Sequence, residues 1–234
     1  MAVYAISDLH LSFGTNKPMN IFGEIWNGYE EKIKENWIAK VKEEDTVIIP
    51  GDISWGIDLK EALEDFKFID ALPGKKIFLR GNHDYYFPTK TKLEKFLVEN
   101  NLSTLKILHN NAFDVENYII CGARGWGKTE HNDAIADKKI IAREEGRLIL
   151  SLENGMRLKN ELNAKGIEKD ILVALHFPPF ISRFESIMKE YGVKICIYGH
   201  LHGYGHSMIR EGMIDGIDYK MVSCDYTKFD LVKL

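Results

Sequence analysis

The stretch of sequence that decides the fold runs from residue 77 to residue 84 and reads IFLRGNHD. Its first three residues are apolar without interruption, which is the pattern of a strand buried on both faces of a parallel sheet. A glycine then lets the chain turn off the strand, and an amide, an imidazole and a carboxylate follow it. We therefore predict that a buried strand ends here and carries chemically active side chains.

The same arrangement occurs at four other places along the chain. Apolar runs that are followed by side chains able to bind a metal ion lie at residues 3–6, 47–49, 171–175 and 195–198. The seven side chains, including the amide of the first stretch, are Asp8, His10, Asp52, Asn82, His176, His200 and His202. Because the carboxyl ends of parallel strands lie along one edge of a sheet, we expect these side chains to meet there.

The residue types predict the kind of ion. Carboxylates, imidazoles and one amide, without a thiolate, suit first-row divalent ions such as Mn²⁺, Fe²⁺ or Zn²⁺. Seven ligands are too many for one catalytic ion with open positions, and they match two ions that share a bridging carboxylate. A single pair such as Asp8 and His10 is as well explained by ordinary polar packing, whereas five strand ends in this order are not.

Glycines stand directly before three of these side chains, namely Asp52, Asn82 and His200. We expect them to let the backbone turn sharply and approach the ions closely.

Between the strands, apolar residues recur at helical spacing and predict helices over residues 22–41, 59–72, 93–97, 134–165 and 184–191. Asp58, with Glu61 three residues later, is the expected N-cap of the second helix, and Gly166 the expected end of the fourth. Further strands are expected at residues 105–108, 113–115, 118–121, 208–210, 217–224 and 229–234.

Composition limits the class of protein. The chain has 234 residues, of which 45% are hydrophobic and 28% charged, so it is globular rather than disordered or repetitive. No linker divides it, and we predict one α/β domain over residues 1–234. A net charge of −4 argues against a broadly basic surface for nucleic acid.

The cellular compartment is predicted from the cysteine positions and from the lack of a signal segment and of a membrane-spanning run. Its three cysteines, Cys121, Cys196 and Cys224, are far apart and lie in apolar runs, as expected of buried thiols in a reducing cytosol. The first residues carry no basic signal segment, and no apolar run approaches the roughly 18 residues of a membrane span. We expect a cytoplasmic protein without a membrane anchor.

The ordered set of strand-end residues resembles the calcineurin-like metallophosphoesterase superfamily, and most of all its small prokaryotic predicted phosphohydrolases. The resemblance implies a four-layer α/β-β/α sandwich with two mixed sheets, as in metallo-dependent phosphatases. It implies one ion on Asp8, His10 and His202, a second on Asn82, His176 and His200, and Asp52 as the bridge. His83 matches the catalytic histidine, and Asp84 is expected to orient it.

The chain departs from the superfamily after Asp52. Many members carry a second aspartate three residues later, where this chain has Trp55. The protein Ser/Thr phosphatases have a phosphate-gripping arginine after this element, and residues 53–56 offer none. A protein phosphatase of that branch is therefore disfavoured.

The resemblance predicts a dinuclear-metal-dependent phosphohydrolase that cleaves phosphomonoester or phosphodiester bonds. In-line attack by a metal-bridging hydroxide, with a proton from His83 to the leaving group, is the expected mechanism. The alternatives are a metal-dependent nuclease and, from a different class, a non-catalytic binding scaffold of the same fold.

The expected partner is a small phosphorylated substrate, and nucleic acid is a less favoured one. Arg124, Trp126 and Lys128 are candidate substrate-binding residues, because the cations suit phosphate and the indole suits stacking on a base. The alternative is a glycine-rich turn with solvated cations. Loop residues 12–28 also follow the first ligand pair and are expected to border the site.

Overall fold

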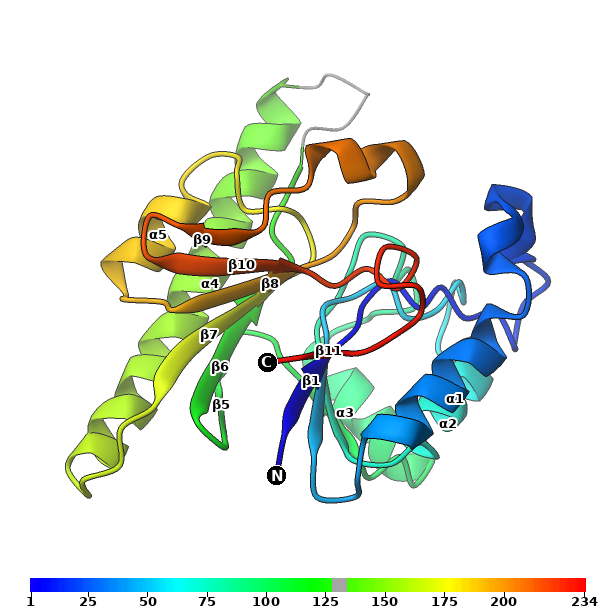
Figure 1. Cartoon of the computed structure of the whole chain (residues 1–234), viewed down its shortest axis with the longest axis horizontal. Helices are drawn as coiled ribbons and strands as arrows, with labels where there is room; N and C mark the ends of the chain where they lie inside the picture. The colour runs from blue at the N-terminus through cyan, green and yellow to red at the C-terminus, as the bar shows by residue number, and fades with distance from the viewer. Residues whose placement is uncertain (128–133) are drawn as a thin grey trace.

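The computed structural model describes residues 1–127 and 134–234, with side chains described for residues 1–127 and 137–234. Two sheets form its centre, and helices lie on both flanks (Figure 1). The first sheet has the order β11 (Val232–Lys233), β1 (Val3–Ala5), β2 (Thr46–Ile49), β3 (Lys75–Phe78), β4 (Leu105–Ile107). The second has the order β5 (Phe113–Val115), β6 (Tyr118–Ala123), β7 (Asp170–Leu175), β8 (Ile195–Tyr198), β10 (Ile217–Met221), β9 (Gly212–Ile214).

Both sheets are mixed, as predicted. Strands β1 to β4 are parallel to one another, and β11 pairs antiparallel with β1 at the edge. In the second sheet, β6, β7, β8 and β10 are parallel, and β5 and β9 are antiparallel edge strands. The parallel strands in each sheet end at the same edge, which is the condition for the predicted site.

Three buried apolar clusters fill the spaces between four layers. One lies between the first sheet and the helices α1 (Tyr29–Lys40), α2 (Leu63–Asp70) and α3 (Lys90–Glu99). Another lies between the second sheet and the helices α4 (Ala134–Asn163) and α5 (Phe184–Glu190). The third joins the sheets themselves and contains Ala5 and Ile48 from the first and Leu172 and Ile197 from the second. The four-layer sandwich is thereby confirmed.

The first predicted helix is shorter than its apolar spacing indicates. Residues 22–28 do not continue it; two short 3₁₀ turns, Met19–Phe22 and Glu24–Trp26, precede α1 instead. Gly28 has a φ of 61°, a left-handed conformation that ends the turn and makes an α-helix begin only at Tyr29. The apolar side chains of this segment are thus free to border the site.

Asp58 acts as an N-cap, as expected, but the turn that it caps comes before the first residue of α2. Its Oδ1 accepts the backbone N–H groups of Lys60 and Glu61, both at 2.9 Å, and Glu61 Oε2 accepts that of Ile57 at 2.9 Å. An irregular turn follows before α2 begins at Leu63.

Three strand predictions for the C-terminal region are wrong in position or extent. Residues 208–210 are not a strand: a 3₁₀ segment, Gly203–Met208, comes first, and the strand of this region is β9. The backbone N–H and C=O of Arg210 bond to the hydroxyl of Tyr198, which removes them from strand pairing. Likewise β10 ends at Met221, and β11 holds only two residues, since Lys228 and Phe229 both have positive φ.

Among the described residues, the helices are too short or too polar to cross a lipid bilayer.

Candidate metal centre

The carboxyl ends of five strands from the two sheets meet at one place. Backbone bonds tie the loops together: Asp8 N–H donates to Gly51 C=O at 3.0 Å, and His10 N–H donates to Asp52 C=O at 3.0 Å. Across the second sheet, Gly199 N–H donates to His176 C=O at 3.1 Å. The structure thus brings the seven predicted ligands to one edge, with Asp8, Asp52 and His176 buried.

The first group of donors is formed by Asp8, His10 and His202, whose ligand atoms lie within 4.8 Å of one another. His10 Nε2 and His202 Nε2 face each other at 3.3 Å, and His202 Nε2 lies 3.3 Å from Asp8 Oδ1. These are the three side chains that the sequence assigned to one ion.

The second group is formed by Asp8, Asp52 and His176, again within 4.8 Å. His176 Nε2 lies 3.4 Å from Asp52 Oδ2 and 2.6 Å from Asn82 Oδ1. Asn82 Oδ1 in turn lies 2.9 Å from His200 Nδ1. The remaining predicted ligands therefore adjoin this second group.

The orientation of His176 shows that the second group fits a cation. Its Nδ1 lies 2.9 Å from the carbonyl oxygen of Pro50, so this nitrogen carries the proton. Burial lowers the pKa of His176 to about 3, so the ring is neutral at pH 7 and its Nε2 holds a lone pair. That lone pair faces oxygens of Asp52 and Asn82, and three acceptors pointed at one another are stabilised by a positive ion between them.

The charges in both groups lead to the same conclusion. Burial alone would lower the pKa of His202, but hydrogen bonds to Asp225 and Asp8 raise it to about 10. Burial and the neighbouring carboxylates of Asp84 and Asp8 raise the pKa of Asp52. A positive charge beside the crowded carboxylates of Asp8, Asp52 and Asp84 stabilises their ionised forms, and a divalent ion supplies that charge at neutral pH.

Four of the seven ligands have a backbone conformation that residues other than glycine rarely adopt. The φ angles are 59° at Asp8, 46° at His10, 52° at Asp52 and 74° at His200. Such conformations cost on the order of 1–3 kcal/mol each and are found mainly at functional sites. They turn the chain sharply within two to five residues of each strand end and aim the side chains at a common centre.

Two of the expected glycines are required by close packing. A Cβ atom at Gly81 would lie 2.0 Å from Asp52 Oδ1, and one at Gly199 would lie 2.3 Å from Asp8 Oδ2. The absent side chains therefore leave room for the two central carboxylates.

Residues that sequence reasoning did not identify hold the ligands in place. Asp8 Oδ2 accepts hydrogen bonds from the hydroxyls of Ser7 and Ser223, the latter at 2.7 Å. Asp225 Oδ1 lies 2.9 Å from His202 Nδ1, which leaves Nε2 of that ring directed at the site. The available signal was their position, since Ser223 and Asp225 follow β10 as the predicted ligands follow the other strands.

His83 and Asp84 are not arranged as expected. The His83 ring lies among aromatic rings, with its centroid 4.6 Å from that of Trp55 and 5.6 Å from that of His10, and its Nδ1 is 3.3 Å from the hydroxyl of Tyr85. The fully buried carboxylate of Asp84 accepts backbone N–H groups of Gly81, Asp52 and Ile53 at 2.7–2.9 Å. Asp84 thus fixes the two ligand loops, and the orienting contact with the His83 ring predicted from the sequence is replaced by Tyr85.

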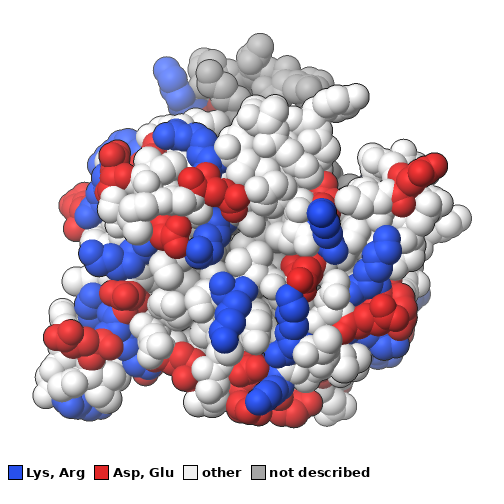
Figure 2. Space-filling model, viewed as in Figure 1, with Lys and Arg blue, Asp and Glu red and all other residues white. Residues whose placement is uncertain are grey.

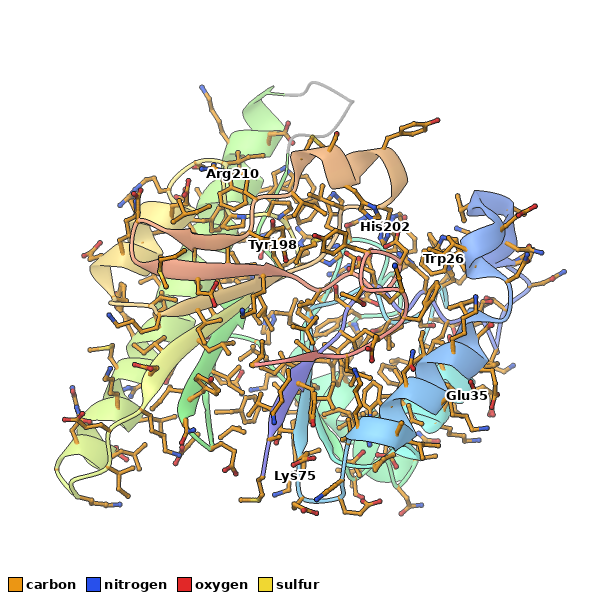
Figure 3. The ribbon with its side chains drawn as sticks, in the orientation of Figure 1. Trp26, Glu35, Lys75, Tyr198, His202 and Arg210 are labelled. Carbon is orange, nitrogen blue, oxygen red and sulfur yellow. The ribbon has the colours of Figure 1, made fainter. Side chains whose placement is uncertain are left out.

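A cavity of about 580 Å³ opens beside His10, His83 and His202. Its other walls are mostly apolar and include Met19, Phe22, Ile25, Trp26 and Trp55, with Lys17 among them. Trp26 and His202 come from opposite ends of the chain and lie near each other at this opening (Figure 3), with ring centroids 6.0 Å apart. The volume is that of a small-molecule site, typically about 300–1,000 Å³.

Trp55 and the segment before α1 both border this cavity, and each accounts for a feature of the sequence. Trp55, which stands where many relatives have an aspartate, stacks on His10 with centroids 4.8 Å apart, and Lys17 Nζ lies 3.0 Å from its ring centroid. The segment before α1 supplies the remaining apolar wall, because it folds as 3₁₀ turns.

Two of the three candidate substrate-binding residues, Arg124 and Trp126, do not line this cavity. Arg124 lines a different one, and its Nη2 lies 3.5 Å from the buried carboxylate of Glu144. Trp126 Nε1 donates to Asp137 Oδ1 at 3.1 Å, and its ring packs on Phe177. Lys128 lies outside the described residues.

Comparison with known proteins agrees with this geometry. A protein of unknown function, AQ665 from Aquifex aeolicus, aligns with a TM-score of 0.53 and 17% identity over 99% of this chain and 95% of its own. TT1561 of Thermus thermophilus aligns with a TM-score of 0.53 and 10% identity over 99% of this chain and 97% of its own. At these identities the similarity shows the fold alone, and no curated protein matches the chain. Residues 1–204 match the family described as calcineurin-like phosphoesterase, and the chain therefore belongs to the calcineurin-like phosphoesterases.

Proposed function

We propose that the protein is a dinuclear-metal-dependent phosphohydrolase that acts on phosphomonoester or phosphodiester bonds. The observation that carries this proposal is the position of Asp52 Oδ2 between the two groups of donors. This oxygen lies 3.9 Å from His10 Nε2 and 3.4 Å from His176 Nε2. A carboxylate in that position suits a bridge between two ions, and Asp8 belongs to both groups.

The proposed cofactors are two divalent ions, with Mn²⁺, Fe²⁺ and Zn²⁺ as the candidates that suit nitrogen and oxygen donors. When bound, such ions polarise a phosphoryl group and lower the pKa of water. Asp8, His10 and His202 would hold one ion, and Asn82, His176 and His200 the other, with Asp52 shared. The Nδ1–H groups of His176 and His202 donate to the carbonyl oxygen of Pro50 and to Asp225 Oδ1, which keeps both imidazoles in the tautomers that such binding requires.

His83 borders the cavity from which a leaving group would depart. Burial and the nearby Lys17 lower the pKa of His83 to about 4, so the ring is neutral in the free protein at pH 7. In the neutral form the ring can only hydrogen-bond to the leaving oxygen, because loss of its remaining N–H proton would leave an imidazolate. A bound phosphate dianion favours the imidazolium, which carries a second proton. We assign to this imidazolium the transfer of that proton to the leaving oxygen, and to Tyr85 the position of its ring.

The cavity beside His83 favours a substrate whose leaving group is apolar or aromatic. The aromatic side chains of Trp26, Trp55 and Phe22 line it, and Lys17 is the lysine or arginine among its described lining residues. On the face shown in Figure 2, acidic and basic side chains are intermixed, and the net charge of −4 does not favour binding of a long nucleic acid. A small phosphorylated molecule is therefore the proposed partner.

The test is hydrolysis of p-nitrophenyl phosphate, bis-p-nitrophenyl phosphate and a single-stranded oligonucleotide by the Mn²⁺-loaded protein. Hydrolysis of either small ester, and its loss in Asp52→Asn, supports the proposal. Asp170→Asn is the matched control, because this exposed carboxylate lies at the opposite end of β7. Cleavage of the oligonucleotide alone would favour the nuclease, and inactivity toward all three substrates with each candidate metal would favour the binding scaffold.

A further inference from the structure

A second cavity, of about 200 Å³, lies where strands β3, β4 and β6 end, between the two sheets. None of its lining residues lines the cavity beside His83. We call it the arginine pocket after Arg80, Arg124 and Arg147, which line it together with Lys90 and Glu144.

The arginine pocket carries an excess of positive charge. Among its described lining residues, Glu144 is the carboxylate that opposes the four cations. Glu144 is fully buried, and its Oε1 lies 2.7 Å from Arg147 Nη1 and 3.5 Å from Arg124 Nη2. One carboxylate neutralises only part of this charge, so the pocket has the electrostatic character of an anion site.

Hydrogen-bond donors in the pocket are left unused. Within the described part of the chain, the Nε atoms of Arg80 and Arg124 are buried and lack a hydrogen-bond acceptor. Arg80, Arg124, Arg147 and Lys90 line one cavity together with His109, and besides burial the charges of Arg147, Lys90 and Arg80 lower the pKa of His109 to about 4. Guanidinium groups that line one cavity match the oxygens of a phosphate.

The pocket is also joined to the loops of the metal centre. Arg80 directly precedes Gly81 and Asn82 in the chain. The backbone C=O of Arg124 accepts the N–H groups of His176 and Phe177, both at 3.0 Å. A ligand held by these two arginines would therefore contact the segments that position two of the metal ligands.

We propose that the arginine pocket binds a tetrahedral oxyanion of the phosphate class, at a site separate from the metal centre. Its volume is below the roughly 300–1,000 Å³ of pockets for drug-sized ligands, which favours a single oxyanion group over a nucleoside. The group is either a free ion or the terminal phosphate of a larger molecule, and the two sources share the same recognition chemistry.

The experiment is a titration of the full-length, metal-loaded protein with inorganic phosphate and with phenylphosphonate, read by NMR of the arginine Nε–H groups. The chain has only seven arginines, so the signals of Arg80 and Arg124 can be assigned by substitution. Both signals are expected to shift saturably with inorganic phosphate. A similar response to phenylphosphonate shows that the pocket accepts the terminal oxyanion group of a larger molecule. A response to inorganic phosphate alone shows that the pocket accepts the free ion.

Two variants weaken the site by different routes. Arg147→Gln is expected to weaken binding at the Arg80 and Arg124 signals by about tenfold or more, since a charge-assisted hydrogen bond is lost. Lys90→Gln removes a lining charge without touching the buried Glu144 pair and keeps the test valid if Arg147→Gln does not fold. Arg157→Gln, an exposed position on the same helix as Arg147, removes equal charge outside the pocket and should leave binding unchanged.

Signals of Arg80 and Arg124 that stay fixed during both titrations would overturn the proposal. Equal affinities in the wild type, Arg147→Gln and Lys90→Gln would also overturn it. Phosphate bound at the metal centre can also shift these signals through the loops of Asn82 and His176, and Arg147→Gln and Lys90→Gln, which leave the metal ligands in place, separate the two sites. Binding is read without turnover, so the outcome is independent of whether the protein hydrolyses phosphate esters.

Discussion

The carboxylate of Asp84 holds the loop of Asp52: Asp84 Oδ2 accepts the backbone N–H of Asp52 at 2.9 Å, in a fully buried position. The same oxygen accepts the N–H of Gly81 at 2.7 Å, so one side chain joins the ends of β2 and β3. The acid next to the proposed catalytic histidine is thereby a positioning residue for the metal centre.

Replacing Asp84 should consequently damage the fold and the metal site together. Asp84→Ala leaves at least three buried N–H groups without an acceptor, and we expect a loss of about 2–5 kcal/mol in the free energy of unfolding and reduced metal content. Urea denaturation and metal analysis of the purified variant measure both. For Asp84→Asn we expect the pH–rate profile to keep its wild-type shape, and a displaced acidic limb would instead show that Asp84 acts on His83.

Replacing His83 should lower turnover and leave stability and metal content unchanged. His83→Ala keeps the backbone N–H that donates to Asp52 Oδ1 at 2.8 Å, so metal content and stability should remain near wild type. Turnover of an alkyl phosphate should fall by about 10²–10⁴-fold, and that of p-nitrophenyl phosphate by less, because p-nitrophenolate leaves without a proton. Steady-state kinetics with both esters decide this, and an equal loss on the two would remove the acid role.

An added methyl group at Gly81 should displace the proposed bridging carboxylate. The Cβ atom would lie 2.0 Å from Asp52 Oδ1, so Gly81→Ala is expected to cost about 1–3 kcal/mol and to lower the metal content. Gly205→Ala is the matched control, since its nearest neighbour would be Leu201 Cβ at 3.5 Å. Similar metal content in the two variants would contradict the close packing.

Metal should stabilise the protein through Asp52. Because burial and the charges of Asp84 and Asp8 raise the pKa of Asp52, a bound cation relieves repulsion. At 100 times its dissociation constant, Mn²⁺ should add about 2.7 kcal/mol to the free energy of unfolding, and a chelator should remove it. Thermal melts should show the shift in the wild type and in His83→Ala but not in Asp52→Ala; a shift retained in Asp52→Ala would place the ion elsewhere.

Lys76 should give the stability of the protein a pH dependence in the alkaline range. It is fully buried, its ammonium donates to the backbone carbonyls of Leu72 and Asp70, and burial lowers its pKa to about 8. The unfolded chain holds the proton up to a pKa of about 10.4, so the free energy of unfolding should rise between pH 8 and pH 10.4. Over this pH range, the free energy of unfolding of the wild type should rise by about 3 kcal/mol relative to that of Lys76→Gln, as measured by urea denaturation. If the free energies of the two proteins changed in parallel with pH, the prediction would be refuted.

The sequence alone located the strands that carry the site and the side chains at their ends. Those strands are short, apolar and β-branched, and the ligands follow each of them within a few residues. Since parallel strands end at a common edge, this local pattern is sufficient to bring Asp8 and Asp52 together on the first sheet and His176 and His200 together on the second. The helix at residues 22–41 was overextended because apolar spacing does not reveal the left-handed turn at Gly28.

Contacts between segments far apart in the chain were decided only by the tertiary structure. Asp225 supports His202, Asp84 holds the loop of Asp52, and Lys17 lies over Trp55, without a motif that links the partners. The arginine pocket depends in the same way on the meeting of β3, β6 and α4. Strand direction, which is local, fixes the ligands within each sheet, whereas the meeting of the two sheets, the supports and the cavities depend on how the layers pack, which the sequence pattern does not specify.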